Sequence, residues 1–387
     1  MNSVTYVRYC NPVGSPLPSQ RAAPTSAGFE YVFPAIRGIQ ARREFYVSMC
    51  PLRLIPKIFL FDEEELAPEV RAQRVLNKGR IPALARYILD NPDDYVFSAL
   101  TASVDGEMQF DPVADEGPGM RLGQLRISMD SQFVINDGQH RRAAIEAALR
   151  DNSDLGDETI AVVFFHDAGL SRCQQMFADL NRHAVRPGRS LGVLYDHRDE
   201  MASLVKLLAL KSAVFHGFVE MESSTLSARS RKLFTLSALY SATNALLQEL
   251  DLTAKEAKDL AGTYWRAVDA LIPEWNLVRN RTLTASDVRR QYLHSHGVAL
   301  HALGRVGNAL LQESRDPKRW QPQLDPLKEV DWSRGNPEWS GRTILAGRVS
   351  KGHQNVVLTV NYLKRRLALA LTAEEQQAED AFTRGDS

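Results

Sequence analysis

The feature that most constrains the fold is a strand-to-helix junction within residues 133–145 (FVINDGQHRRAAI). The apolar run at its start predicts a strand, and Ile145 and Leu149, four residues apart, predict the apolar face of a following helix. Between them, Gly138 lets the backbone come close to a ligand. Free backbone N–H groups and the positive helix end coincide at such a turn, which is typical of an anion site. A single glycine turn is equally typical of an ordinary strand–helix connection, so both interpretations stand.

The polar side chains of this turn suit a phosphate-bearing ligand. Arg141 can form two parallel hydrogen bonds with phosphate oxygens. His140 can donate to a phosphate or transfer a proton near neutral pH. Asp137 is the candidate Mg²⁺ contact. Its carboxylate could equally have no role beyond interacting with the positive end of the helix dipole. We therefore take Asp137 and His140 as candidate catalytic residues and Asp137 as the candidate metal ligand.

The turn also resembles a known nucleotide-binding motif. Residues 137–141, followed by Ala144, resemble the DGQHR signature and are similar to the GxxRxxA box of ParB-type partition proteins and the nucleotide-binding box of sulfiredoxins. In those proteins the box lies at a helix start and holds nucleotide phosphates. A second motif, Asn181-Arg182 before Pro187, resembles the ENxxR box that faces the GxxRxxA box across the pocket, but the Glu of the ENxxR box is missing. The resemblance implies ATP or CTP as the ligand, with Mg²⁺ as an optional partner, at Gly138, Gln139, His140, Arg141, Asn181 and Arg182.

Three further stretches narrow the family. Residues 33–38 (FPAIRG), 50–56 (CPLRLIP) and 95–102 (YVFSALTA) resemble the DndB family of the DNA phosphorothioate modification system, and the resemblance extends over residues 30–370. It implies a DNA-binding regulator that represses the operon for DNA sulfur modification. The implied partners are double-stranded operator or promoter DNA and other DNA sulfur modification proteins, and a homo-oligomer is compatible with this. Any ATP hydrolysis should be slow and regulatory, as in ParB-type switches.

A basic strip over residues 36–57 is the candidate DNA-contacting surface. It holds five basic residues and one acidic residue, so its local net charge is five minus one, or plus four. The whole chain carries 47 basic and 47 acidic residues, so its formal net charge is zero. A DNA surface must therefore come from local clustering. The DndB resemblance implicates the cysteine of this strip in DNA binding, although a buried, inert thiol is the more common outcome. A solvated basic face is the alternative; the candidate DNA contacts are Arg37, Arg42, Arg43, Cys50 and Arg53.

The length of 387 residues predicts two domains. We expect an α+β protein with a ParB/sulfiredoxin-like mixed-sheet domain over residues 30–195 and a mostly α-helical domain over residues 196–371. Residues 1–29, rich in proline, are expected to form a flexible arm, and the acidic residues 372–387 a frayed tail.

Hydrophobic periodicity predicts the individual elements. Strand patterns cover residues 45–47, 57–61, 95–104 and 160–165, with a hairpin formed by 125–129 and 132–135. Helix patterns cover residues 81–89, 170–180, 198–211, 231–249, 254–271 and 285–312. Thr253 and Glu256 predict a capping box. The segment 314–342, with Trp320, Trp332 and Trp339, is expected to pack irregularly on the helices.

Several site classes are disfavoured. Three widely spaced cysteines without a CxxC pair argue against a disulfide framework or zinc knuckle, and Cys173 is read as core. His294, His296 and His301 lack the spacing of a zinc helix. A Walker A string is missing, which excludes a P-loop ATPase. No apolar run reaches the ~18 residues of a membrane span, and a cytoplasmic protein is expected.

Three functions remain open. The first is a DNA-binding regulator whose nucleotide state controls its grip on DNA. The second is a ParB-like nuclease, ranked lower because no clear carboxylate cluster for two metals is present. The third is a scaffold within the modification complex with a vestigial nucleotide pocket. The polar loop 223–232 contains Arg229, Arg231 and Lys232. It is either a solvated segment that precedes the next helix or a second phosphate contact.

Overall fold

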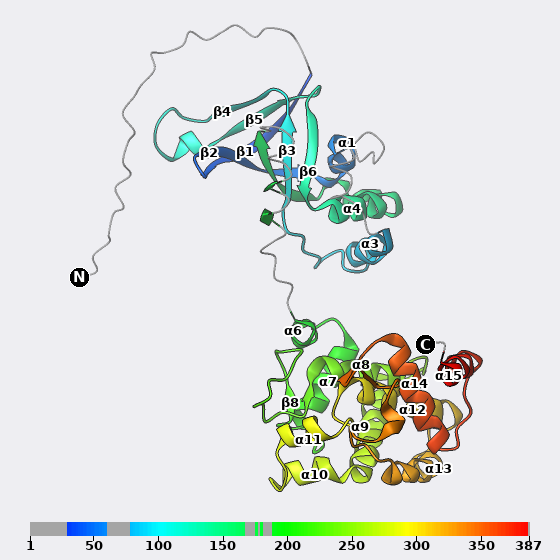
Figure 1. The fold of residues 1–387 in the computed structure, drawn as a ribbon. Coiled ribbons are helices and arrows are strands. Elements are labelled where there is room, and N and C mark those ends of the chain that lie inside the picture. Colours follow the sequence, from blue (N-terminus) through cyan, green and yellow to red (C-terminus); the bar gives the residue numbers. More distant parts are fainter. Residues whose placement is uncertain (1–28, 60–77, 167–174, 177–178, 181–187, 386–387) are drawn as a thin grey trace. The chain divides into compact units, whose positions relative to one another are not determined.

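A computed structural model describes residues 29–59, 78–166, 175–176, 179–180 and 188–385. The chain divides into two compact units, residues 1–184 and 185–387 (Figure 1). The division falls before the expected boundary at residue 195, because α6 (Arg189–Tyr195) packs with the helices that follow it. The buried Ser190 hydroxyl donates to the Ser223 carbonyl at 3.1 Å and lies 3.2 Å from the Ser237 hydroxyl, which ties α6 to the second unit.

The first unit is built on a mixed sheet. Within the described residues the sheet has seven strands in the order β4-β5-β1-β2-β7-β3-β6. Neighbouring strands run antiparallel except for β3 and β7, which are parallel. The strands are β1 (Glu30–Gln40), β2 (Arg43–Pro51), β3 (Leu100–Asp105), β4 (Met108–Pro112), β5 (Leu122–Ser128), β6 (Gln132–Asp137) and β7 (Thr159–His166).

Three helices cover one face of this sheet, α1 (Ile55–Ile58), α3 (Ile81–Asp90) and α4 (Gln139–Asp151) (Figure 1). Ile145 and Ala148 of α4 pack in the same buried cluster as Leu100 and Phe164 of the strands. The expected helix over residues 81–89 is therefore confirmed as α3, and the junction at residue 138 joins β6 to α4.

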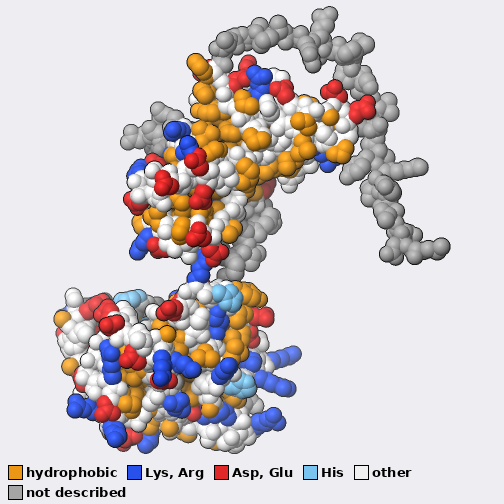
Figure 2. Space-filling view, turned by 180° about the vertical axis from the view of Figure 1, so that it is seen from behind, with side chains coloured by type: hydrophobic (Ala, Val, Ile, Leu, Met, Phe, Trp, Pro, Cys, Tyr) orange, Lys and Arg blue, Asp and Glu red, His pale blue; other side chains and the backbone are white. Residues whose placement is uncertain are grey.

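No described helix covers the opposite face of the sheet, and that face is apolar. Val32 and Ile36 on β1 and Met49 on β2 are each about half exposed, at 53%, 54% and 49%. Figure 2 shows hydrophobic side chains gathered over the strands of this unit. We call Val32, Ile36, Met49 and Leu122 the bare sheet face.

Two strand predictions were wrong, and a third was partly confirmed. The expected hairpin of residues 125–129 and 132–135 does not form, because β5 pairs with β1 and β4 while β6 pairs with β3. The three residues between β5 and β6 bring the end of β5 close to the start of β6, but the two strands do not pair. Residues 57–61 were expected to be a strand, but residues 57–58 belong to α1, where Pro56 suits the first turn of the helix, and residues 60–61 lie outside the described residues. The strand expected over 95–104 begins only at Leu100.

The second unit is mostly helical. Its helices are α6, α7 (Glu200–Lys211), α8 (Leu236–Leu247), α9 (Ala254–Leu271), α10 (Pro273–Arg279), α11 (Ala285–Gln291), α12 (Gly297–Glu313), α13 (Pro317–Trp320), α14 (His353–Arg366) and α15 (Ala373–Arg384). Two short ladders join β8 (Val219–Glu220) to β9 (Phe234–Thr235) and β10 (Ile344–Leu345) to β11 (Arg348–Val349). The bounds of α9 and its Thr253–Glu256 capping box are as predicted.

The helix predicted over residues 285–312 is broken into α11 and α12. Residues 292–296 interrupt it, since Tyr292 bridges Ser333 and the Leu293 amide donates to the Trp332 carbonyl at 2.9 Å. The segment 314–342 packs on the helices as predicted, with its three tryptophans at most 5% exposed.

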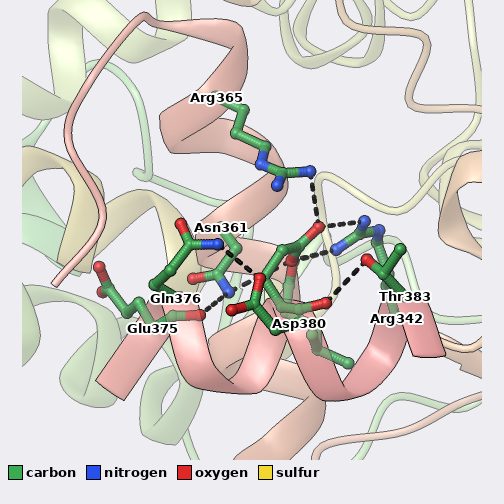
Figure 3. Close-up of polar contacts among 9 residues, drawn as sticks. Arg342, Asn361, Arg365, Glu375, Gln376, Asp380 and Thr383 are labelled. Atoms are coloured by element: carbon green, nitrogen blue, oxygen red, sulfur yellow. Dashed lines mark hydrogen bonds and ion pairs between the residues drawn. The ribbon is translucent and has the colours of Figure 1, made fainter. Parts of the chain in front are cut away.

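The predicted frayed tail is instead a docked helix. Glu379 on α15 is fully buried and accepts two hydrogen bonds from Arg342, at 2.6 and 2.7 Å, and one from Arg365 at 2.8 Å (Figure 3). Glu375 pairs with Lys364 of α14 at 2.6 Å and also forms a capping box with Thr372. Acidic residues that look like a solvated tail in the sequence are therefore ion-pair partners of the helical unit.

Candidate functional site

The strand-to-helix turn has the geometry that the sequence predicts. Gly138 is the N-cap of α4 with a φ of +108°, a conformation that favours glycine. A methyl group there would lie 2.4 Å from Cδ2 of Leu100, so no larger residue fits without a shift. Among the residues that the structure describes, no side chain caps the start of α4. The first N–H groups of the helix therefore lack a side-chain acceptor at the place where an anion is favoured.

Arg141 closes the turn through an ion pair. Its guanidinium lies 2.5 Å from the carboxylate of Asp137, and it also donates to the Ser98 hydroxyl. The Arg141 side chain is 18% exposed, and its buried Nε has no hydrogen-bond partner among the described residues. A guanidinium with a remaining donor beside an uncapped helix start can take part in binding an oxyanion.

The other predicted residues of the turn differ in access. Burial, and then the charge of Arg80 on the neighbouring turn η2 (Lys78–Arg80), lowers the pKa of His140 below its ordinary value. His140 is therefore neutral near pH 7 and can accept or donate one proton. Gln139 is buried, and its amide donates to the Ile135 carbonyl at 3.4 Å. The side chain of Gln139 is thus held inside the fold while its backbone belongs to the helix start, and its role in nucleotide binding remains a prediction.

Two neighbours of the turn were missed in the sequence. Ser98, just before β3, contacts Arg141. Asn136 is fully buried, donates to the Ser103 hydroxyl at 2.8 Å, and keeps its Oδ1 without a partner among the described residues. Only the approach of β3 to β6 brings these side chains together, so a local pattern could not reveal them.

Part of the predicted site cannot be placed. Asn181 and Arg182, the second candidate box, lie outside the described residues, as does Cys173. The described residues contain no group of three or more His, Cys, Asp or Glu side chains that could hold a metal ion. Mg²⁺ at Asp137 would therefore need further ligands from a nucleotide or water.

The basic strip is not one patch. Arg42 lies in the two-residue turn between β1 and β2, where both Ala41 and Arg42 have positive φ, and Arg43 follows as an exposed residue. Neither arginine has an ion-pair partner among the described residues. Arg53 lies beyond the far end of β2, about 25 Å along a strand of this length. We call the first two arginines the hairpin tip.

Two other cations of the strip are engaged in the fold. Arg37 donates to the Met120 carbonyl at 2.8 Å, lies 3.5 Å from Glu44 and stacks over Phe110. Arg53 pairs with Asp157. Of the predicted arginine contacts, the hairpin tip is therefore the part whose charge is most available to DNA.

Cys50 faces the core of the first unit. It is 0% exposed, because it alternates with the exposed Met49 along β2 and faces the core. Burial raises the pKa of its thiol to about 12. The positive charges nearby in sequence do not affect this pKa, so the structure agrees with the alternative of a buried thiol, and a role of Cys50 in DNA binding remains a prediction.

The comparison with known families bears on this geometry. The family model described as DndB, DNA-sulfur modification-associated, matches residues 33–370. The chain belongs to the DndB family. The match includes the sheet except for the first three residues of β1, and it includes the α4 turn, the hairpin tip and α14 of the helical unit. No curated protein and no solved structure matches the chain.

Membership of the DndB family links the protein to DNA sulfur modification. Among the described helices, none is both long enough and apolar enough to span a membrane. The features left for a functional role in the first unit are the uncapped start of α4, the hairpin tip and the bare sheet face.

Proposed function

We propose that this DndB-family protein is a DNA-binding regulator that represses the genes for DNA sulfur modification, and that a nucleotide bound at the start of α4 controls its grip on DNA. The observation that carries the proposal is the uncapped turn at Gly138 with its Asp137–Arg141 ion pair. The turn combines free N–H groups, a helix dipole and a cation, which are the elements of a phosphate site.

The ion pair suggests how a nucleotide could act as a switch. Phosphate oxygens would compete with Asp137 for the guanidinium of Arg141, which also holds Ser98 beside β3. A Mg²⁺ ion carried by ATP or CTP would compensate the freed carboxylate of Asp137. Breaking the Arg141–Ser98 contact would alter how residues before β3 are held. If hydrolysis follows, His140 or Asp137 is the candidate proton acceptor for water, and the rate should be slow.

In this proposal the hairpin tip supplies the DNA contact. Arg42 and Arg43 have no competing acid among the described residues, and they project from a turn between two long strands. Such arginines hold phosphates without reading sequence, so operator recognition needs additional groups.

The test compares nucleotide binding with DNA binding in the full chain. Arg141→Ala should weaken ATP or CTP binding by about ten- to a hundredfold, because a charge-assisted contact contributes about 1.5–3 kcal/mol. Arg150→Ala is the matched control, since Arg150 lies on the same helix, is exposed and pairs with Glu146 alone among the described residues. Gel shifts with and without nucleotide then show whether DNA affinity changes. Equal nucleotide affinity in all three proteins would remove the α4 turn from the proposal.

A scaffold role is the second candidate, and the bare sheet face favours it. An exposed apolar face of this kind is typical of a protein-binding surface, and another sulfur modification protein or a second copy of the chain could cover it. A nuclease is less favoured, since the described residues hold no cluster of three metal-ligating side chains. Incubation of supercoiled DNA with Mg²⁺ or Mn²⁺ tests the nuclease directly.

A further inference from the structure

A cavity of about 500 Å³ lies in the second unit and shares no lining residue with the α4 turn. The loop 224–228 forms one wall, α11 a second, and the start of α12 the floor. A second cavity of about 250 Å³ shares Ser224, Ala238, Gly297 and Lys351 with it. Together they form what we call the α12 cavity.

The lining of the α12 cavity is strongly basic. It includes five cationic side chains and no Asp or Glu, namely Arg189, Arg289, Arg290, Arg334 and Lys351. Two of these cations serve the fold. Arg289 donates to four carbonyl groups of the loop 227–232, and Arg290 pairs with Asp287 at 2.5 Å.

The other cations are open to a ligand. Lys351 and Arg189 are exposed and have no hydrogen-bond or ion-pair partner among the described residues. Arg334 makes one contact, to the Gly347 carbonyl at 3.2 Å. An all-basic lining with free cations predicts an anionic occupant.

The start of α12 adds backbone donors to these cations. α12 has 17 residues, and its N-cap His296 makes no capping hydrogen bond through its side chain. The His296 ring instead contacts the Arg289 carbonyl at 2.8 Å. A methyl group at Gly297 would lie 3.0 Å from Nζ of Lys351, which places the ammonium group over the helix start. Backbone N–H groups, a helix dipole and a lysine thus face one volume.

A buried hydroxyl group points independently to a ligand. Ser295 lines the cavity and is only 5% exposed, yet its Oγ has no hydrogen-bond partner among the described residues. An unsatisfied buried hydroxyl is unfavourable unless something fills its hydrogen-bonding capacity. An oxyanion seated at the helix start would accept from it.

We propose that the α12 cavity binds the phosphate group of a nucleotide-sized phosphate ester, held by Lys351, Arg334, the first N–H groups of α12 and Ser295. The volume falls within the range of small-molecule sites. Leu226, Leu233 and Ala238 give the cavity an apolar wall suited to the uncharged part of the ester. The site is separate from the α4 turn and does not depend on the function proposed above.

The experiment measures ligand binding by the full chain. All five tryptophans lie in the second unit, so thermal unfolding followed by tryptophan fluorescence reports on that unit. Inorganic phosphate, adenosine, ATP, CTP and a short DNA duplex serve as probes. A ligand that binds the folded state raises the unfolding temperature in a concentration-dependent way. The nucleotides should do so and adenosine should not.

Three variants locate the binding. In this tryptophan readout of the second unit, Lys351→Ala should weaken nucleotide binding at least tenfold, and Gly297→Ala should weaken it by narrowing the space below Lys351. Lys328→Ala, at an exposed lysine of the same unit paired with Asp325, should leave it unchanged.

Unchanged nucleotide affinity in both Lys351→Ala and Gly297→Ala would overturn the proposal. So would a shift produced only by the DNA duplex and lost in Lys351→Ala, because the cavity would then be a DNA-backbone contact. Loss of binding in Arg141→Ala alone would support the α4 site and overturn the α12 cavity.

Discussion

Removing the Glu379 carboxylate should destabilise the second unit strongly. Glu379 is fully buried and holds Arg342, which is only 7% exposed, through two hydrogen bonds of 2.6 and 2.7 Å (Figure 3). In Glu379→Ala, Arg342 would remain buried without its anion, while Arg365 could turn to solvent. Breaking a buried ion pair from one side costs about 3–5 kcal/mol. We expect a loss of this size in the free energy of unfolding.

Urea denaturation followed by tryptophan fluorescence measures this loss, because every tryptophan lies in the second unit. With a slope of about 2–3 kcal/mol/M, the midpoint should fall by about 1–2 M. Glu374→Ala is the control, since Glu374 is exposed in the first turn of the same helix. Its effect should stay below about 1 kcal/mol. Equal midpoints for the two variants would refute the structural role of Glu379.

The same ion pair predicts a pH dependence. Burial alone would raise the pKa of Glu379, but the hydrogen bonds and charge of Arg342, with Asn361 and Arg365, hold the pKa below its ordinary value. A lowered pKa in the folded state stabilises above the unfolded pKa, and this stability is lost as pH falls through the folded value. Glu379→Gln should therefore flatten the loss of stability below about pH 4.5. Parallel pH curves for wild type and variant would contradict this.

Two further predictions concern the first unit. Burial raises the pKa of Cys50 to about 12. In a Cys10→Ser, Cys173→Ser variant, a thiol reagent at pH 7 should therefore react slowly with Cys50 in the native protein and rapidly in urea. Fast labelling of the native protein would place Cys50 at the surface. Gly138→Ala should destabilise the first unit by about 1 kcal/mol or more, because Gly138 has a positive φ and an added methyl group would meet Leu100. Hydrogen exchange of the α4 amides would detect this loss. Unchanged exchange would show that the turn tolerates a side chain.

Local patterns predicted the parts of the fold that local forces determine. The strand, glycine turn and helix around residue 138 follow from periodicity and from one residue that allows a positive φ. The start of α9 follows from a capping box within four residues.

Features that depend on distant partners were not predictable in this way. β6 pairs with β3 rather than with the adjacent β5, and a strand pattern does not specify its partner. The acidic residues of α15 resemble a solvated tail in the sequence, because their partners Arg342 and Lys364 come from other segments of the chain. Likewise, the basic strip is continuous only in the sequence, since β2 carries its two ends apart.

The most direct test of the proposed function is the salt dependence of DNA binding. The affinity of the full chain for a duplex from upstream of the sulfur modification genes would be measured at several salt concentrations for wild type, for Arg42→Ala with Arg43→Ala, and for Arg86→Ala with Arg150→Ala. The last pair are exposed arginines on α3 and α4. Each phosphate contact contributes about 0.9 to the log–log slope, so the hairpin-tip variant should lose up to about two units while the control pair keeps the wild-type slope. Parallel lines for all three proteins, or the absence of DNA binding by wild type, would contradict the account.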